Sequence, residues 1–224
     1  MVVDQPSNSP QSKRATPVLL YWPNLIGYAR IITAFISFYL MPTRPVAALW
    51  YYSLSLLADG IDGYAARLFN QSSRFGACLD MVTDRFSTTC LCVVLARMCP
   101  DLTLLLQLIV ALDISSHYIQ MYTSLALGKV SHKDVGTSKG IMNTLMRLYY
   151  TSRPVLWTLC FGNEAFLLGL YMLYWFPENA FYRIVWVISV PLFAFKQFMN
   201  AVQLGTACGS LIEEDTKGKA GKSA

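Results

Sequence analysis

The sequence predicts an all-α integral membrane protein with six transmembrane helices and a short N-terminal interfacial segment. The first observation is the composition: 54% of the residues are hydrophobic and 14% are charged, against about 25% charged in an average soluble domain. The second is that apolar residues gather into runs long enough for a helix to cross a hydrocarbon core of about 30 Å. The third is the alternation of basic and non-basic connections between these runs.

The chain begins with a polar segment rich in proline and serine, and we expect residues 1–16 to form a disordered cytosolic tail. The segment PVLLYWP at residues 17–23 carries Tyr21 and Trp22, whose side chains favour the membrane interface. We expect this segment to lie along the membrane surface. The next run, Leu25–Met41, is of span length and lacks a small-residue cleavage site, so it is predicted as the first transmembrane helix rather than a cleavable signal.

The later spans follow in order, separated by polar connections. The run Val46–Ala58 is too short to cross the membrane, so its helix is predicted to continue to Arg67. The remaining spans are predicted at Phe75–Met98, Leu102–Leu127, about Pro154–Phe176 and about Phe181–Leu204. Together they form one six-helix domain at residues 17–208, and a disordered basic cytosolic tail is predicted at residues 209–224.

Lysine and arginine residues are unevenly divided between the two sides of this topology. Because cytoplasmic loops are enriched in these residues, both termini are expected in the cytosol. The richer side holds Lys13, Arg14, Arg67, Arg74, Lys129, Lys133, Lys139, Lys217, Lys219 and Lys222, and the other side holds Arg44, Arg97 and Arg183. The net charge of +5 reflects this sidedness and an attraction to anionic lipid headgroups, and it does not indicate a nucleic-acid partner.

Four aspartates interrupt the apolar pattern at the end of the second span and the start of the third. Asp59 and Asp62 are three residues apart, and Asp80 and Asp84 are four apart, so each pair shares one helix face. An antiparallel hairpin would bring the two pairs opposite each other. Four converging carboxylates repel at short range, so we expect one or two divalent cations, Mg²⁺ or Mn²⁺, between them.

Small and basic residues accompany the acids at helical spacing. Gly63, Ala66 and Gly76 keep the acidic face nearly free of side-chain bulk, so a phosphate or a nucleotide can approach the backbone there. Arg67 and Arg74 add fixed positive charge on the same rim. Metal ions that bracket a pyrophosphate are the arrangement that phosphoryl transfer uses.

At these residues the sequence resembles the CDP-alcohol phosphotransferase family, and it matches every fixed position of the family signature. The matched residues are Asp59, Asp62, Gly63, Ala66, Arg67, Gly76, Asp80 and Asp84. The resemblance implies an integral membrane enzyme with six transmembrane helices that transfers a phosphatidyl or related group from a CDP-linked donor to an alcohol, with release of CMP and the use of two divalent ions.

The resemblance also implies roles for individual residues. Asp59, Asp62 and Asp80 would hold the first metal, Asp59, Asp80 and Asp84 the second, and Asp84 would be the general base. Residues implied at the CDP-diacylglycerol site are Gly63, Ala66, Arg67, Gly76, Arg74, Asn24 and Arg30.

Further stretches resemble the eukaryotic members of the family that use inositol as the acceptor. They are PNLIGYARI, RFGACLDMVTDR, SHK at residues 131–133 and YYTSRP at residues 149–154. This likeness implies CDP-diacylglycerol and myo-inositol as substrates, phosphatidylinositol and CMP as products, and a homodimer in the endoplasmic reticulum membrane. Lys133, Arg153 and Asp62 would bind inositol.

Alternatives remain at this stage. Other family members transfer to glycerol 3-phosphate or serine with the same donor machinery. A membrane prenyltransferase also uses aspartate-rich helices to hold Mg²⁺, and a divalent-cation transporter lines its path with carboxylates. Asp113 and His117, four residues apart, are expected to form an interhelical hydrogen bond that orders the bundle, with a place beside the acceptor as the alternative. Asn163 and Glu164 are expected at a dimer interface or a contact between helices, and the sequence does not choose between them.

Overall fold

The computed structural model describes residues 17–127 and 152–220, and all regular elements within these ranges are helical. This confirms the all-α prediction. In chain order the elements are η1 (Val18–Leu20), α1 (Trp22–Leu40), α2 (Pro45–Leu68), α3 (Arg74–Met98), η2 (Pro100–Leu102), α4 (Thr103–Ala126), α6 (Arg153–Trp175) and α7 (Ala180–Ala220).

Three helical segments in the described part of the chain are long and apolar enough to cross a membrane. They are Pro100–Ala126, Pro154–Trp175 and Ala180–Thr216. The helix α2 continues through Asp59 and Asp62 to Leu68, as expected for a second span that is short in apolar residues. The acidic stretch lies on α2 and α3, and it lowers the hydropathy of both.

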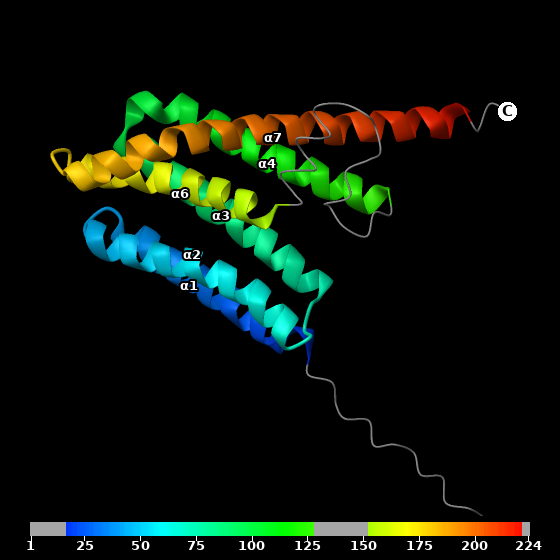
Figure 1. Ribbon diagram of the computed structural model, residues 1–224, viewed down its shortest axis with the longest axis horizontal. Helices are drawn as coiled ribbons and strands as arrows, with labels where there is room; N and C mark the ends of the chain where they lie inside the picture. The colour runs from blue at the N-terminus through cyan, green and yellow to red at the C-terminus, as the bar shows by residue number, and fades with distance from the viewer. Residues whose placement is uncertain (1–16, 128–151, 221–224) are drawn as a thin grey trace, which may run out of the picture.

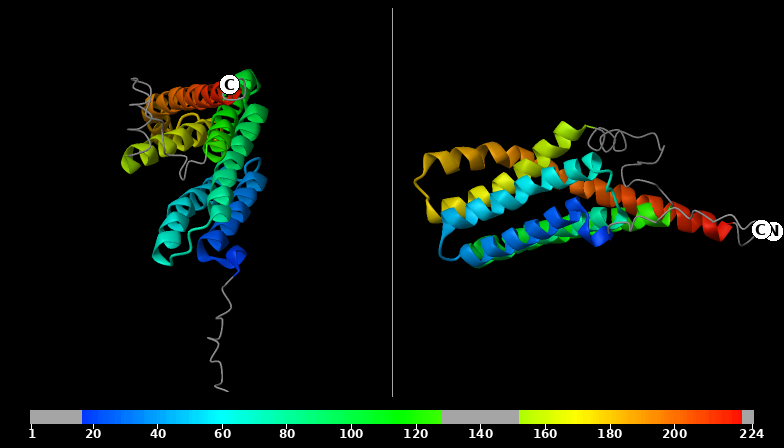
Figure 2. Two further views of the ribbon diagram at one scale, coloured as in Figure 1. Left: turned by 90° about the vertical axis from the view of Figure 1, so that its right-hand side faces the viewer. Right: turned by 90° about the horizontal axis from the view of Figure 1, so that it is seen from below.

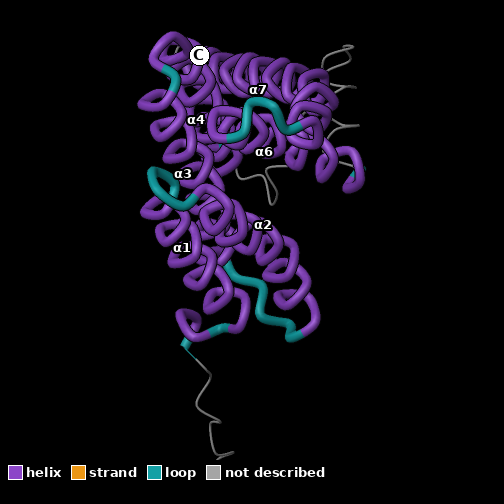
Figure 3. The backbone as a smooth tube through the Cα atoms, turned by 90° about the vertical axis from the view of Figure 1, so that its left-hand side faces the viewer, coloured by secondary structure: helices purple, strands orange, loops and turns teal. Residues whose placement is uncertain are grey.

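The helices form two groups joined by α3. Helices α1 and α2 pack against each other, α7 packs on both α4 and α6, and α3 contacts α1, α4 and α6. Figure 1 and Figure 3 show α3 between the two groups, and the left view of Figure 2 shows the same arrangement. One end of the bundle holds the start of α1, the α2–α3 turn, the start of α6 and the end of α7 (Figure 1).

Small and hydroxyl side chains set the register of α1 against α2. Ala34 and Ala48 are fully buried, so the two backbones can approach closely. Ser37 Oγ donates to the carbonyl of Ala48 at 2.7 Å, and Ser55 Oγ donates to the carbonyl of Arg30 at 3.0 Å. This register places Arg30 beside the acidic end of α2.

The turn between α2 and α3 is built from polar residues with distinct conformational roles. Asn70 ends α2 in the left-handed region, with φ of 52°, which asparagine tolerates. Ser73 caps α3 by accepting a hydrogen bond from the Gly76 amide at 2.9 Å. Gln71 Oε1 accepts from the Trp22 amide at 2.8 Å, which ties this turn to the start of α1.

The C-terminal end differs from the sequence-based expectation. We predicted a disordered tail at residues 209–224, but α7 continues without interruption to Ala220. The helix formers Leu211, Glu213 and Glu214 extend an already nucleated helix, and neither Gly205 nor Gly209 ends it.

Candidate functional site

The α2–α3 hairpin brings the predicted aspartates together. Ligand oxygens of Asp59, Asp62 and Asp80 lie within 4.8 Å of one another. Asp84 lies one helical turn beyond Asp80 and joins the group through a shared partner, Arg30. The side chains of Asp59 and Asp80 are 39% and 47% exposed, so a ligand can reach the cluster from outside.

The shared partner of the four aspartates is the guanidinium of Arg30 on α1, whose side chain is only 3% exposed. Its Nη2 lies 2.5 Å from Asp59 Oδ1 and 2.6 Å from Asp84 Oδ1. Its Nη1 lies 2.9 Å from Asp62 Oδ2 and 2.7 Å from Asp80 Oδ1. Arg30 was predicted at the CDP-diacylglycerol site, and the structure places it among the carboxylates instead of along the cavity described below.

The carboxylate oxygens of this cluster are suitable ligands for a divalent cation. All four side chains offer carboxylate oxygens, the ligands that hard cations such as Mg²⁺ and Mn²⁺ prefer. A positively charged group, the Arg30 guanidinium, already lies within hydrogen-bonding distance of one oxygen of each aspartate. One guanidinium charge against four carboxylates leaves the cluster able to attract further positive charge.

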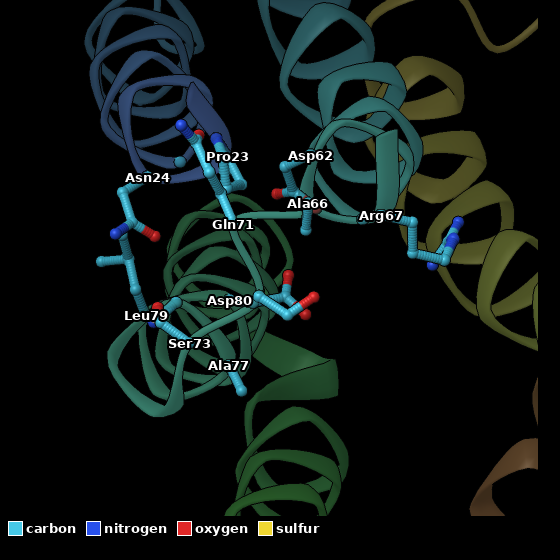
Figure 4. A pocket seen from close by; sticks show the side chains of 14 residues that line it. Pro23, Asn24, Asp62, Ala66, Arg67, Gln71, Ser73, Ala77, Leu79 and Asp80 are labelled. Atoms are coloured by element: carbon cyan, nitrogen blue, oxygen red, sulfur yellow. Dashed lines mark hydrogen bonds between the residues drawn. The ribbon is translucent and has the colours of Figure 1, made fainter. Parts of the chain in front are cut away.

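A cavity of about 180 Å³ opens beside the aspartates between α1, α2 and α3. Figure 4 shows Asp62 and Asp80 facing each other across it. The lining residues are Pro23, Asn24, Gly27, Asp62, Gly63, Ala66, Arg67, Gln71, Ser72, Ser73, Gly76, Ala77, Leu79 and Asp80. Five residues predicted to bind the CDP-linked donor are therefore brought together, namely Asn24, Gly63, Ala66, Arg67 and Gly76.

Small residues keep this cavity open at two points. A Cβ atom at Gly76 would lie 2.8 Å from Asn24 Oδ1 and 3.1 Å from Ser73 Oγ, so a larger residue there would displace its neighbours. At Gly63 the nearest atom to an added Cβ is Arg67 Nη1, at 3.6 Å. Asn24 is 1% exposed, its Nδ2 donates to the Val18 carbonyl at 2.5 Å, and its buried Oδ1 has no hydrogen-bond partner among the described residues.

Other predicted site residues lie apart from the cluster. Arg67 lines the cavity, but its side chain extends away from Asp80 in Figure 4. Arg74 is exposed at the first position of α3 and does not line the cavity. Of the predicted inositol residues, Lys133 lies outside the described residues, and Arg153 is described only as the first backbone position of α6.

A second polar cluster lies beyond the aspartates, between α3, α4 and α7. Arg85 Nη1 donates to Asp113 Oδ1 at 2.7 Å and lies 2.9 Å from a ring nitrogen of His117. Asn200 donates to the same Asp113 oxygen at 3.2 Å, and the buried Lys196 donates to Asn200 Oδ1 at 2.5 Å. The contacts of Asp113 with Arg85 and Asn200 are the interhelical hydrogen bonds expected at this position, whereas Lys196 was not predicted. A lysine within an apolar run is the signal that would have found it.

Glu164 on α6 connects to the other helix group. Its carboxylate oxygens accept from Tyr52 on α2 and Thr88 on α3, both at 2.8 Å, and from Asn163 at 3.2 Å. Thr88 lies one turn after Asp84 on α3, so this contact supports the helix that carries half of the aspartates.

Comparisons with known proteins agree with the signature residues. The model of the CDP-alcohol phosphatidyltransferase family matches residues 20–195. The chain is 46% identical to CDP-diacylglycerol–inositol 3-phosphatidyltransferase of Saccharomyces cerevisiae, over 94% of each chain. It is 44% identical to the human protein of the same name, over 92% of this chain and 97% of the relative. No solved structure matches the chain.

Proposed function

Because the chain belongs to the CDP-alcohol phosphatidyltransferase family, we propose that it transfers the phosphatidyl group of CDP-diacylglycerol to myo-inositol, with phosphatidylinositol and CMP as products. The observation that carries this proposal is the 44–46% identity, over more than nine-tenths of the chain, to relatives named for this transfer. The four aspartates that surround Arg30 beside a cavity support the proposal, because their carboxylates can hold the divalent ions that such a transfer uses.

Two divalent ions, Mg²⁺ or Mn²⁺, are proposed to bind the four aspartates. Asp59, Asp62 and Asp80, whose oxygens converge, would hold the first ion, and Asp59, Asp80 and Asp84 would hold the second. When bound, such ions neutralise the charge that develops on the pyrophosphate and orient its reacting phosphorus.

The cavity is proposed to hold the CDP part of the donor. Gly63, Ala66 and Gly76 have little or no side chain, so the backbone itself forms part of the cavity wall there. The Asn24 Oδ1 atom, which has no partner among the described residues, offers a hydrogen-bond acceptor in the same cavity. Arg67 is long enough to turn toward a phosphate, and a guanidinium can contact two phosphate oxygens at once. Arg74 would add positive charge to the same donor site, whereas Arg30 is engaged by the four aspartates.

Asp84 is proposed as the general base that takes the proton from the attacking inositol hydroxyl. Its Oδ1 is engaged by Arg30 at 2.6 Å, whereas Oδ2 lies 3.9 Å from the nearest Arg85 nitrogen, beyond hydrogen-bonding distance. We therefore propose Oδ2 as the atom that receives the proton. Lys133, Arg153 and Asp62 would hold the remaining inositol hydroxyls.

All six long helices are proposed to cross the endoplasmic reticulum membrane, with both termini in the cytosol and two copies forming a homodimer. Basic residues support this sidedness, because Arg67 and Arg74 lie at the end of the bundle that holds the aspartates, whereas Arg44 and Arg97 lie at the opposite end. Many large apolar side chains on all six helices are exposed, among them Phe35, Trp50 and Phe161, and lipid would cover them.

An acceptor panel tests the proposed function. Purified full-length protein in detergent is given CDP-diacylglycerol and Mg²⁺ or Mn²⁺, with myo-inositol, serine, glycerol 3-phosphate or no acceptor, and both CMP and the lipid product are measured. Product with inositol alone supports the proposal. Product with another acceptor would retain the donor site and overturn the inositol assignment, and the absence of CMP with every acceptor would overturn the transfer reaction.

A further inference from the structure

Arg30 is the group whose position the proposed reaction does not explain. It is 3% exposed, it comes from a helix outside the acidic hairpin, and it contacts one oxygen of each of the four aspartates at 2.5–2.9 Å. Carboxylates this close repel one another strongly in a poorly solvated site. A buried guanidinium is suited to oppose that repulsion because its fork of N–H groups can serve several oxygens at once.

We infer that Arg30 is the resident counter-cation of the aspartate cluster: it holds the metal site assembled before any ion binds, and it competes with divalent ions for the charge of the carboxylates. This inference rests on the proposed metal site. It assigns Arg30 as a positioning residue that acts through the aspartates and not as a contact of the nucleotide.

Arg30 joins the helices that carry the aspartates. Asp62 lies on α2 and Asp80 on α3, and both accept from Arg30 Nη1. The same guanidinium therefore connects both helices of the hairpin to α1. The carbonyl of Arg30 also accepts a hydrogen bond from Ser55 on α2, so its backbone is held in the same register. Without Arg30, the one cation left beside the four carboxylates among the described residues would be Arg85, whose Nη2 lies 3.9 Å from Asp84 Oδ2.

The positive charge of Arg30 opposes the binding of a divalent ion at the same carboxylates. A fixed positive charge next to a site lowers the affinity of that site for any cation, by an amount that grows as the local dielectric constant falls. The guanidinium nitrogens lie at contact distance from the oxygens that a metal would use. Removal of this charge should therefore destabilise the metal-free protein and at the same time tighten its binding of a divalent ion.

The test uses chelator-treated, full-length protein in detergent, with Mn²⁺ alone as the probe and its paramagnetic resonance signal as the measure of free ion. We expect Arg30→Gln to bind Mn²⁺ about tenfold more tightly than the wild type. We also expect its metal-free Tm to fall by about 5 °C and saturating Mn²⁺ to remove most of that loss, because binding to the folded state stabilises it. Arg44→Gln is the matched control: it removes the same charge from an exposed position at the far end of α2 and should change neither quantity.

Equal or weaker Mn²⁺ binding by Arg30→Gln, or an equal loss of Tm with and without Mn²⁺, would overturn the inference and leave the metal site standing. If Arg30→Gln does not fold, Arg30→Lys decides. Its single ammonium group cannot serve four carboxylates, so its loss of Tm should again be smaller with Mn²⁺, and equal losses would overturn the inference. A wild-type protein that binds no Mn²⁺ would overturn the proposed metal site itself, and this inference with it.

Discussion

The two carboxylate oxygens of Asp84 have different surroundings. Arg30 engages Oδ1 of Asp84, and Oδ2 faces Arg85 at a distance too long for a hydrogen bond. Oδ1 is thus held by Arg30, and Oδ2 is the oxygen that we propose to accept the proton. Asp62, in contrast, is 8% exposed, and its side chain is the least exposed of the four aspartates.

Asp84→Asn should leave the protein folded and lower turnover by about 10²–10⁴-fold, the usual size of a general-base contribution. An amide keeps the oxygen that Arg30 contacts but cannot accept the proton of the inositol hydroxyl. CMP release measures turnover, and Tm in detergent checks the fold. Asp101→Asn, which makes the same change at an exposed residue of η2, should have normal turnover. Near-normal turnover of Asp84→Asn would remove Asp84 as the base.

Gly76→Ala should raise the KM for CDP-diacylglycerol by about tenfold or more and leave the KM for inositol nearly unchanged. The added Cβ would lie 2.8 Å from Asn24 Oδ1 and would move Asn24 at the cavity wall; a loss of one good polar contact changes affinity by this order. Gly205→Ala is the control, since nothing lies within 4 Å of its added Cβ on α7. Equal increases in both KM values would indicate a general structural effect instead.

The aspartates and the small residues could be predicted from the sequence because helical spacing alone puts Asp59 and Asp62, or Asp80 and Asp84, on one face. The position of Arg30 could not. Its contact with the acids depends on the register between α1 and α2, which the hydroxyl of Ser55 helps to set across 25 residues of sequence. Spacing along one helix carries no information about that register.

Among the helices, α6 provides a polar contact from one group to the other. Glu164 accepts hydrogen bonds from Tyr52 and Thr88, which belong to the two helices of the acidic hairpin. A polar contact between helices in an apolar surrounding is worth on the order of 1 kcal/mol. It also restricts which residues can face each other, so it sets the position of α6 as well as its stability.

Glu164→Ala should lower the Tm in detergent by roughly 3–8 °C, because two buried hydroxyls lose their acceptor, at about 1–2 kcal/mol in all. Glu164→Gln keeps one carbonyl oxygen and should lose less than half as much. Thermal unfolding followed by circular dichroism provides the measurement. A Tm of Glu164→Ala equal to the wild type would show that these hydrogen bonds do not hold α6 in place.

Helix existence could be predicted from apolar run length, whereas helix ends could not be predicted equally well. The extension of α2 beyond Ala58 was predicted because a span needs that length, and it runs to Leu68. The end of α7 was placed near Leu204 because apolar character fades there, yet the helix continues to Ala220. Backbone hydrogen bonding propagates through polar residues once a helix is nucleated, so hydropathy marks where a helix leaves the apolar layer and not where it ends.

At the scale of the whole molecule, the aspartates lie in the halves of α2 and α3 next to the turn that joins them, and this turn lies at the end of the bundle where α1 begins and α7 ends (Figure 1). With the proposed topology, this end faces the cytosol. The basic residues Arg67 and Arg74 lie at the same end.

Epitope tags at both termini should therefore be accessible to antibody in cells whose plasma membrane alone has been permeabilised. A tag inserted at Glu178, in the turn between α6 and α7, should become accessible only after all membranes are dissolved, because it lies at the opposite end of the bundle. Immunofluorescence under the two conditions gives the answer. A protected terminal tag would contradict the orientation inferred from the basic residues.

The residues proposed for the donor occupy one continuous stretch of the chain, from Asn24 to Asp84, and the cavity between α1, α2 and α3 is complete within it. Of the residues proposed for the acceptor, Lys133 and Arg153 come later in the chain, whereas Asp62 lies within the donor stretch. The proposed acceptor residues after α3 can therefore change by mutation without altering the cavity between α1, α2 and α3. We therefore expect that exchanging the segment after α3 between relatives would alter the choice of acceptor alcohol more than the use of the CDP-linked donor.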